Sequence, residues 1–241
     1  MPPDAPRNTP PPTPLPHAQP DAQPDTQPGA LPATIATALE EDIVFGRLHP
    51  RERLLEEELA TRFGATRHAI RQALAELERM GLVERIPNRG AQVKAYTLAE
   101  VEQLYALRAL LEREAARQMP LPLPEADLAT LRTHQERHDE AVRRHDARAA
   151  FRANLAFHRA LFDRCGNLFL AETIEHLALR AHAIRFAAVT DPAALAQARD
   201  EHHAMLAALA SGDREALLRL CEAHLVPSRR AYLRAQAAFL A

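Results

Sequence analysis

The chain has 241 residues, of which 47% are hydrophobic, and its formal net charge is only −2. This composition is typical of a globular protein with one or two domains, and the near-neutral charge gives no argument for nucleic-acid or membrane binding from overall charge. Two cysteines, Cys165 and Cys221, are too few for a disulfide framework, and no apolar run forms a signal core or approaches the roughly 18–20 residues of a membrane span, so we expect a cytoplasmic protein.

The start of the chain is rich in proline. Twelve of the 19 prolines lie within residues 1–32, separated mainly by Gln, Asp and Thr. Proline fixes φ and removes a backbone donor, and the segment has little apolar surface to bury. We therefore predict a disordered tail over residues 1–30. The alternative is a proline-rich ligand for a partner domain.

Residues 31–96 predict a small domain of three helices and a β-hairpin. The segment "LPATIATALEEDIVFGRL" has apolar residues at helical spacing, and "LLEEELATRFG" predicts a short second helix that ends at Gly64. In "TRHAIRQALAELERMG", Thr66 is the candidate N-cap and Gly81 ends the third helix. "LVERIP" and "AQVKAY" predict two strands joined by the tight turn "NRG".

A short helix, a glycine-containing turn and a second helix are typical of a helix-turn-helix, whose second helix enters the major groove of DNA. Residues 62–94 contain seven Arg or Lys and three Glu, a local balance of about +4 that attracts phosphate. Arginine can also read guanine edges. The alternative is a three-helix module with solvated arginines. The candidate DNA-reading residues are Thr66, Arg67, His68 and Arg71.

Residues 97–241 predict an all-helical domain. Breaks such as "PLPLP", "TDP" and "SGD" divide this region into periodic segments. Six helices are expected, over residues 98–119, 125–145, 147–165, 169–189, 192–211 and 213–239. The predicted fold class is therefore mainly α, with a helix-turn-helix domain followed by a six-helix bundle.

Polar side chains interrupt the apolar faces of three of these helices. Asn154 and His158 are four residues apart in "FRANLAFHRALF", so they point to the same side, and two later helices each place one histidine inward. Three imidazoles and an oxygen donor suit a divalent metal, although a lone inward histidine is more often a hydrogen-bonded core residue. His134 and His138 have the same spacing, but their helix is polar nearly all round, so we expect them in solvent. The candidate ligand set is Asn154, His158, His202 and His224.

Two arginines are candidates for binding an anion. Arg108 lies among leucines in "ALRALLE", where a buried cation needs an anionic partner. That partner is either the carboxylate of a bound ligand or Glu112 in an internal salt bridge. Arg185 is a weaker candidate of the same kind.

The segment "ELATRFGATRHAIRQALAELERMGLVERIPNRGAQV" resembles the winged-helix domain of the GntR family of bacterial transcription regulators, and the likeness covers residues 35–93. In that family the start of the third helix and the wing between the strands contact DNA. The His68-Ala69 pair replaces the family's usual Thr-Pro, so base preference is expected to differ there. The implied DNA contacts are Thr66, Arg67, His68 and Arg71 on the helix, and Asn88, Arg89 and Gly90 in the wing.

The segments "LYALRALLEREAAR", "NLAFHRALFDRCGN", "EHHAMLAALASGD" and "CEAHL" resemble, in order and spacing, the FCD-type effector domain of the FadR-like subgroup. The resemblance implies a divalent metal, zinc or nickel, at the four candidate ligands, and an organic acid effector bound by Arg108, beside which Arg185 stays the weaker candidate. Asn154 stands where many members have aspartate. The neutral amide predicts weaker metal binding, or a metal-free pocket for an anion.

The resemblance implies a ligand-responsive transcription regulator without enzymatic activity, and repression is the commoner role in the family. We expect a homodimer that binds a palindromic double-stranded DNA operator. One alternative is a DNA-binding dimer without an effector response. The other is a helical metallohydrolase, for which Glu201 is the only adjacent acid and lies about 100° around the helix from His202.

Overall fold

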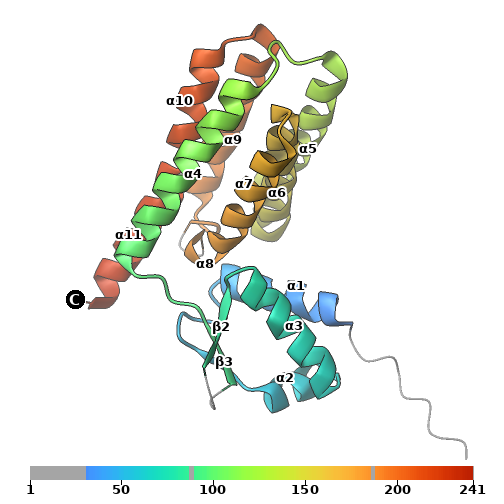
Figure 1. The fold of residues 1–241 in the computed structure, drawn as a ribbon, viewed down its shortest axis with the longest axis vertical. Helices are drawn as coiled ribbons and strands as arrows, with labels where there is room; N and C mark the ends of the chain where they lie inside the picture. The colour runs from blue at the N-terminus through green and yellow to red at the C-terminus, as the bar shows by residue number, and fades with distance from the viewer. Residues whose placement is uncertain (1–30, 87–89, 186–187, 241) are drawn as a thin grey trace, which may run out of the picture.

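The computed structural model describes residues 31–86, 90–185 and 188–240, arranged as a small N-terminal part below a bundle of long helices (Figure 1). This arrangement confirms the predicted fold class, a winged helix-turn-helix followed by an all-helical part. The tail predicted over residues 1–30 lies outside the described residues, as do Asn88 and Arg89 of the predicted wing.

The N-terminal part is held together by apolar stripes on its helices. Its elements are α1 (Pro32–Val44), β1 (Arg53–Leu54), α2 (Glu56–Phe63), α3 (Arg67–Arg79), β2 (Val83–Ile86) and β3 (Gly90–Val93). Ile35, Leu39, Ile70 and Leu77 are fully buried where α1 and α3 pack together. The predicted cap is confirmed, because Thr66 Oγ1 accepts a hydrogen bond from the Ala69 amide at 3.2 Å.

The sheet has three strands, one more than the predicted hairpin. The strand order is β1-β3-β2 and both pairings are antiparallel. Strand β1 consists only of Arg53 and Leu54, opposite Gln92 and Ala91. Two residues carry no alternation of apolar and polar side chains, so sequence periodicity does not reveal such a strand.

The C-terminal part is all helical. Its elements are α4 (Leu98–Gln118), α5 (Glu125–Arg143), α6 (Ala147–Phe162), the 3₁₀ turn η1 (Asp163–Cys165), α7 (Leu168–Arg180), α8 (His182–Arg185), α9 (Pro192–Ser211), α10 (Arg214–His224) and α11 (Val226–Leu240). Helix α4 begins with a complete capping box between Thr97 and Glu100. Within the described ranges, none of the helices is both long and apolar enough to cross a bilayer.

Two of the six predicted helices are divided, which corrects the sequence-based boundaries. The helix expected over residues 169–189 is divided at Ala181, between α7 and α8, and this turn buries the imidazole of His182. The helix expected over residues 213–239 is divided at Leu225, and Pro227 lies in the first turn of α11. Proline lacks an amide hydrogen, so it fits a first turn but not a helix interior.

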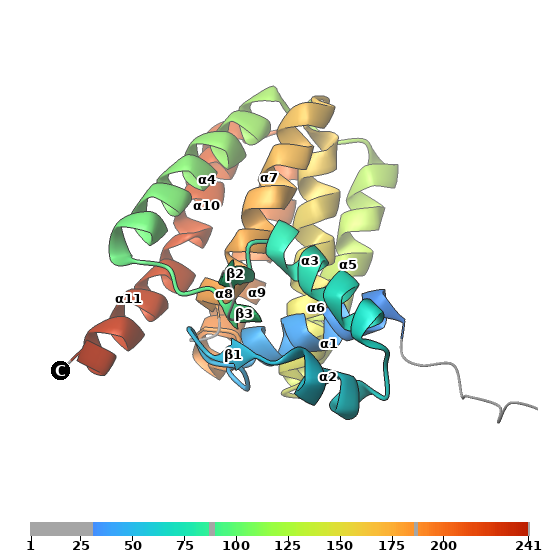
Figure 2. The ribbon, with the colours of Figure 1, turned by 60° about the horizontal axis from the view of Figure 1, so that its bottom comes forward.

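Helix α1 is the junction between the two parts. Figures 1 and 2 show α1 beneath the lower end of the bundle, next to α8. Val44 of α1 packs in a buried apolar cluster with Phe151 of α6 and Val189. Glu40 and Glu41, also on α1, are each only 5% exposed. The junction therefore combines an apolar contact with buried charge.

Candidate functional site

The candidate DNA-reading residues lie together on one exposed end of α3. Thr66, Arg67, His68 and Arg71 are all exposed. In the absence of DNA, α2 supplies acidic partners: Arg71 Nε donates to Glu56 at 2.8 Å, and Arg67 lies 3.6 Å from Glu57. Both arginine side chains remain more than 60% exposed. This face can therefore meet a phosphate or a base edge without rearrangement of the core.

Of the three predicted wing residues, the structure describes one. Gly90 begins β3, is exposed, and has φ of 83°, a left-handed conformation that favours glycine. Asn88 and Arg89 lie outside the described residues.

Three histidines from three helices meet inside the bundle. His158 comes from α6, His202 from α9 and His224 from the end of α10. The Nε2 atom of His158 lies 2.9 Å from Nε2 of His224 and 3.1 Å from Nε2 of His202. His202 is fully buried, and the other two are partly buried. We call these three residues the histidine cluster.

Two hydrogen bonds fix which ring nitrogens of the cluster carry protons. His224 Nδ1 lies 2.5 Å from Glu201 Oε2, and a carboxylate can only accept, so Nδ1 is the donor. Gln135 donates its amide to Asp139 at 2.7 Å, so its oxygen accepts from His202 Nδ1 at 2.9 Å. In the neutral ring, this places an Nε2 lone pair toward the centre of the cluster on His202 and on His224.

This proton arrangement suits a cation. His158 can donate a proton from Nε2 to only one of the two lone pairs, so at least one pair of acceptors is left facing each other at about 3 Å. Burial, followed by the neighbouring charges of His224 for both rings, holds the pKa values of His158 and His202 well below the usual range. Neutral imidazoles braced by outer hydrogen bonds are the ligands that zinc and similar ions require. The residues present therefore fit a divalent metal.

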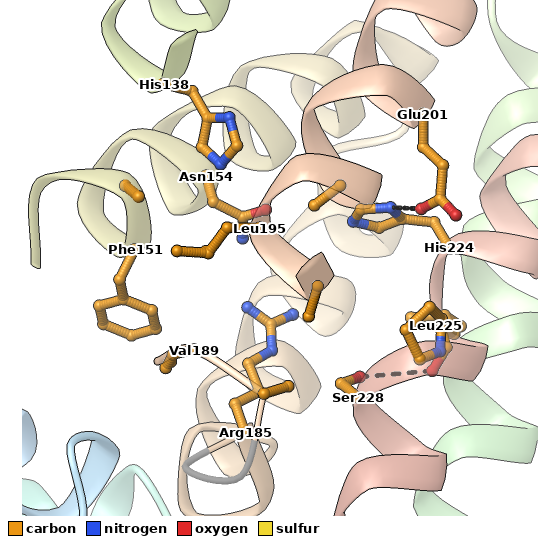
Figure 3. Close-up of a pocket in the computed structure, with 15 residues that line it drawn as sticks. His138, Phe151, Asn154, Arg185, Val189, Leu195, Glu201, His224, Leu225 and Ser228 are labelled. Atoms are coloured by element: carbon orange, nitrogen blue, oxygen red, sulfur yellow. Dashed lines mark hydrogen bonds and ion pairs between the residues drawn. The ribbon is translucent and has the colours of Figure 1, made fainter. Parts of the chain in front are cut away.

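Asn154 lies one turn before His158 on α6 and faces a small cavity. This cavity has a volume of about 90 Å³ and is also lined by His138, Arg185 and His224. Figure 3 shows the Asn154 amide and the Arg185 guanidinium pointing into the same space from opposite sides. Within the described ranges, the Asn154 side chain forms no hydrogen bond. Its oxygen lone pairs are therefore free to coordinate a cation or to accept a hydrogen bond from a bound group.

A second, larger cavity of about 320 Å³ reaches the cluster at His158. His158 is part of its wall, together with four arginines, Arg108, Arg152, Arg159 and Arg185, and three acids, Glu112, Asp163 and Glu175. Arg185 lines both cavities. The volume lies within the range of small-molecule pockets. Arg108 and Arg159 pair there with Glu112 and Glu175, whereas Arg185 has no carboxylate in ion-pair contact within the described part of the chain. This space suits a small anion.

The two predicted anion-binding arginines have different surroundings. Arg108 is buried and donates to Glu112 from Nε at 3.0 Å and from Nη2 at 2.8 Å, which is the internal salt bridge that the sequence left open. Its Nη1 has no partner among the described residues. Arg185 has no carboxylate in ion-pair contact within the described part of the chain, and burial together with Arg108 lowers its pKa to about 10. Arg185 is thus the better candidate for a ligand carboxylate.

The expectation that His134 and His138 lie in solvent is wrong for His138. His138 is fully buried, its ring centre lies 5.2 Å from that of His202, and neither ring nitrogen has a partner among the described residues. The buried residues of α5, which packs against α6 and α9, begin with Leu128, Leu131, Gln135 and His138 and end with Ala141. Their spacing of three or four residues is a helical stripe, which the surrounding polar residues obscure.

Sequence reasoning also missed the residues that brace the cluster. Gln135 belongs to the stripe on α5 just described. Glu201 directly precedes His202 and was considered only as a hydrolytic base, yet its carboxylate accepts from His224 on another helix. Helical spacing shows which face a residue occupies but not which helix lies opposite.

Two family models match the chain. Residues 31–93 match the model described as "Bacterial regulatory proteins, gntR family", and residues 103–226 match the model described as "FCD domain". The two matches correspond to the N-terminal part and to most of the helical bundle.

Individual proteins extend this similarity. The chain is 30% identical over 140 residues to the HTH-type transcriptional regulator YdhC of Bacillus subtilis (strain 168), covering 58% of this chain and 62% of YdhC. It is 26% identical over 190 residues to the HTH-type transcriptional repressor RspR of Escherichia coli (strain K12), covering 78% of this chain and 82% of RspR. Among solved structures, that of E. coli McbR/YncC superposes with a TM-score of 0.71 at 25% identity, covering 86% of this chain and 99% of the McbR/YncC chain.

A first prediction concerns the buried pair of Arg108 and Glu112, which are 4% and 2% exposed. Arg108→Met leaves a buried carboxylate without its partner, so we expect the free energy of unfolding to fall by about 3–5 kcal/mol. The double variant with Glu112→Leu should lose less than Arg108→Met alone. Urea denaturation measures both. The exposed pair of Arg113 and Glu222 is the control, and Arg113→Met should change stability by less than about 1 kcal/mol. A small loss in Arg108→Met would contradict the structural role.

A second prediction concerns pH. Burial lowers the pKa of His138 to about 4, so between roughly pH 6.5 and pH 4 the unfolded chain binds a proton that the folded chain does not. The stability contributed by neutral His138 is therefore lost as the pH falls, by about 2 kcal/mol at pH 5. The free energy of unfolding of the parent protein is expected to be lower at pH 5 than at pH 7, and His138→Leu should make this difference smaller by that amount. Urea denaturation of chelator-treated protein at the two pH values measures it. The exposed His49→Leu variant should retain the parent's pH dependence, and an unchanged dependence in His138→Leu would contradict the burial effect.

Proposed function

The chain belongs to the GntR family of bacterial regulatory proteins, with an FCD domain behind its DNA-binding domain, and we propose that it controls transcription in response to a small organic acid. Members of this family are transcriptional regulators and not enzymes, which sets the metallohydrolase alternative aside. The observation that carries the proposal is the larger cavity, where His158 of the histidine cluster lines one space with four arginines, of which Arg185 has no ion-paired carboxylate among the described residues.

We propose that the DNA site is a palindromic operator bound by a homodimer. The exposed end of α3 supplies Thr66, Arg67, His68 and Arg71 for the major groove, and Gly90 marks the base of the wing, to which we also assign Asn88 and Arg89. Leu107 and Leu110, three residues apart on α4, are 43% and 65% exposed. An apolar surface of this kind is typical of one that a second copy covers, and two-fold symmetry then sets symmetric half-sites.

Whether the protein represses or activates transcription is proposed from a similar protein. The relative RspR is named a repressor, and we propose the same role for this chain. In this scheme the DNA-binding arrangement is populated without the acid, and the acid shifts the population because it binds another arrangement more tightly. A protein acting on a chromosomal operator works in the cytoplasm, which is the location that we propose.

The effector that the cavity favours is an anion. Arg185 combines burial with the absence of an ion-paired carboxylate among the described residues, so a ligand carboxylate would lower the free energy of the charged guanidinium. Arg108 is held by Glu112 and can still offer its unpaired Nη1. The effector's carboxylate would then lie between these arginines and the histidine cluster.

We propose that the histidine cluster holds one divalent metal, zinc or nickel. His158, His202 and His224 would supply Nε2 ligands, and the Asn154 amide oxygen would be the fourth protein donor. When bound, the metal would provide a Lewis acid that attracts a carboxylate oxygen. Because Asn154 is uncharged, the site would carry one negative charge fewer than with aspartate. An anionic ligand is therefore more strongly favoured to complete the coordination of the metal.

For DNA binding, we expect Arg67→Ala and Arg71→Ala each to weaken operator affinity by about 1–3 kcal/mol, since each removes a contact to a base edge or phosphate. The operator would be obtained by selection from random duplexes, and affinity measured by gel shift. Arg79→Ala is the control, because Arg79 is equally exposed and ion-paired but lies at the other end of α3. Glu56→Gln should strengthen binding by freeing Arg71. Unchanged affinity in both alanine variants would refute the assignment of this face.

For the metal, we expect His158→Ala to lose bound zinc or nickel, measured by elemental analysis after loading and dialysis. Glu201→Gln should retain the ligand but weaken metal affinity by roughly 10–100-fold, because it removes the charged partner of His224. Asn154→Asp should strengthen it. His203→Ala is the control, since His203 adjoins His202 but is 52% exposed and faces Asp139. Equal metal content in His158→Ala and the parent would exclude the cluster as the site.

A further inference from the structure

The DNA-binding domain places a buried carboxylate against the wall of the larger cavity. Glu40 of α1 is 5% exposed and accepts from Arg152 of α6, whose Nη1 and Nη2 lie 3.2 and 3.1 Å from Glu40 Oε2. Its other oxygen, Oε1, lies 2.8 Å from Nδ1 of His182 on α8. Glu40 therefore joins α1 to two different helices of the FCD domain.

The same arginine and histidine also belong to the cavity. Arg152 and His182 both line the larger cavity, and the Arg152 side chain is 36% exposed. Arg152 thus has one side against α1 and another toward the space in which a ligand would bind. A carboxylate inside the cavity and the carboxylate of Glu40 would compete for one guanidinium.

We propose that Arg152 is a second anion subsite of the effector cavity, occupied in the ligand-free protein by Glu40, and that an effector with two acidic groups displaces Glu40 and releases α1. The inference rests on the proposed function, because it concerns the same cavity. It adds the chemical class of the effector, a dicarboxylate or a similar organic dianion, and the contact through which binding reaches the DNA-binding domain.

The charges at the junction indicate that Glu40 and a ligand carboxylate compete for Arg152 and do not bind it at the same time. Glu40 is joined there by Glu41, which accepts from Arg152 Nη2 at 3.0 Å and from Arg148 Nε at 2.8 Å. Burial alone would raise the pKa of Glu40, but the hydrogen bond and charge of His182 and those of Arg152 hold it below the usual value, so the carboxylate is ionised. A ligand carboxylate at Arg152 would add a third negative charge beside two buried ones, which favours departure of α1.

The spacing along α6 supports a ligand with two acidic ends. Arg152 and His158 are six residues apart, which is about 9 Å along the helix axis. Both line the larger cavity, and Arg185 also lines it. One acidic group would be held near His158 and Arg185, and the second would reach Arg152. A monocarboxylate could occupy the first position but would leave Glu40 in place.

The test compares dicarboxylates of three to six carbons with monocarboxylates of the same length, using the full chain at constant ionic strength. Thermal shift measures binding, and hydrogen exchange with mass spectrometry measures protection of the α1 amides. We expect the dicarboxylates that bind to speed α1 exchange by about tenfold and monocarboxylates to leave it unchanged. Glu40→Gln should bind those dicarboxylates about tenfold more tightly and show fast α1 exchange without ligand.

Two arginine variants separate the subsite from the rest of the junction. Arg152→Gln should bind dicarboxylates more weakly, and ligand should no longer change its α1 exchange. Arg148→Gln is the matched control: Arg148 pairs with Glu41 across the same junction but does not line the cavity, so the ligand response should persist.

The outcomes distinguish this inference from the function on which it rests. If every acid fails to bind, the proposed effector function is overturned and the inference with it. If only monocarboxylates bind, or dicarboxylates bind while α1 exchange stays unchanged or slows, the effector function stands and the Arg152 subsite is overturned. An affinity for dicarboxylates that Glu40→Gln does not increase would also overturn it.

Discussion

The convergence of three imidazoles is the constraint around which the FCD domain is organised. His158, His202 and His224 come from three helices, and Nε2 of His158 lies 2.9 Å from Nε2 of His224 and 3.1 Å from Nε2 of His202. Burial and neighbouring charge hold the pKa values of His158 and His202 well below the usual range, so these two rings are neutral. Glu201 and Gln135 hold the outer nitrogens, which fixes two of the rings in position. The two cavities each reach this meeting point, the smaller one at His224 and the larger one at His158.

Helix α1 is part of the DNA-binding domain in chain order, but its side chains contact both this domain and the FCD domain. Its apolar residues pack on α3, whereas Glu40 and Glu41 face arginines of α6 and the histidine of α8. Buried ion pairs contribute little net stability compared with apolar packing, because both charges must lose water. They do impose a defined partner on each carboxylate. Each ion pair therefore holds one carboxylate of α1 in one position at the junction. Because the pair adds little stability, another anion can replace that carboxylate.

Local features were readable from the sequence, and long-range ones were not. The Thr66 cap, the ends of α2 and α3 near Gly64 and Gly81, and the inward face of His158 depend on residues a few positions apart, so periodicity and capping chemistry predicted them. Strand β1 exists only through pairing with β3. The burial of His138 depends on which helices cover α5. The contact of Glu40 with Arg152 joins residues 112 positions apart, and no local pattern encodes it.

The shared use of Arg152 has a consequence for sensitivity. Coupling between two sites is reciprocal: if an effector weakens the arrangement that binds DNA, the DNA weakens effector binding by the same factor. A molecule seated on its operator would then require more effector than a free molecule. The concentration at which genes are switched would rise with operator affinity, so one protein could set different thresholds at different promoters. Substitutions at Glu40 would tune those thresholds without altering a residue that contacts DNA or metal.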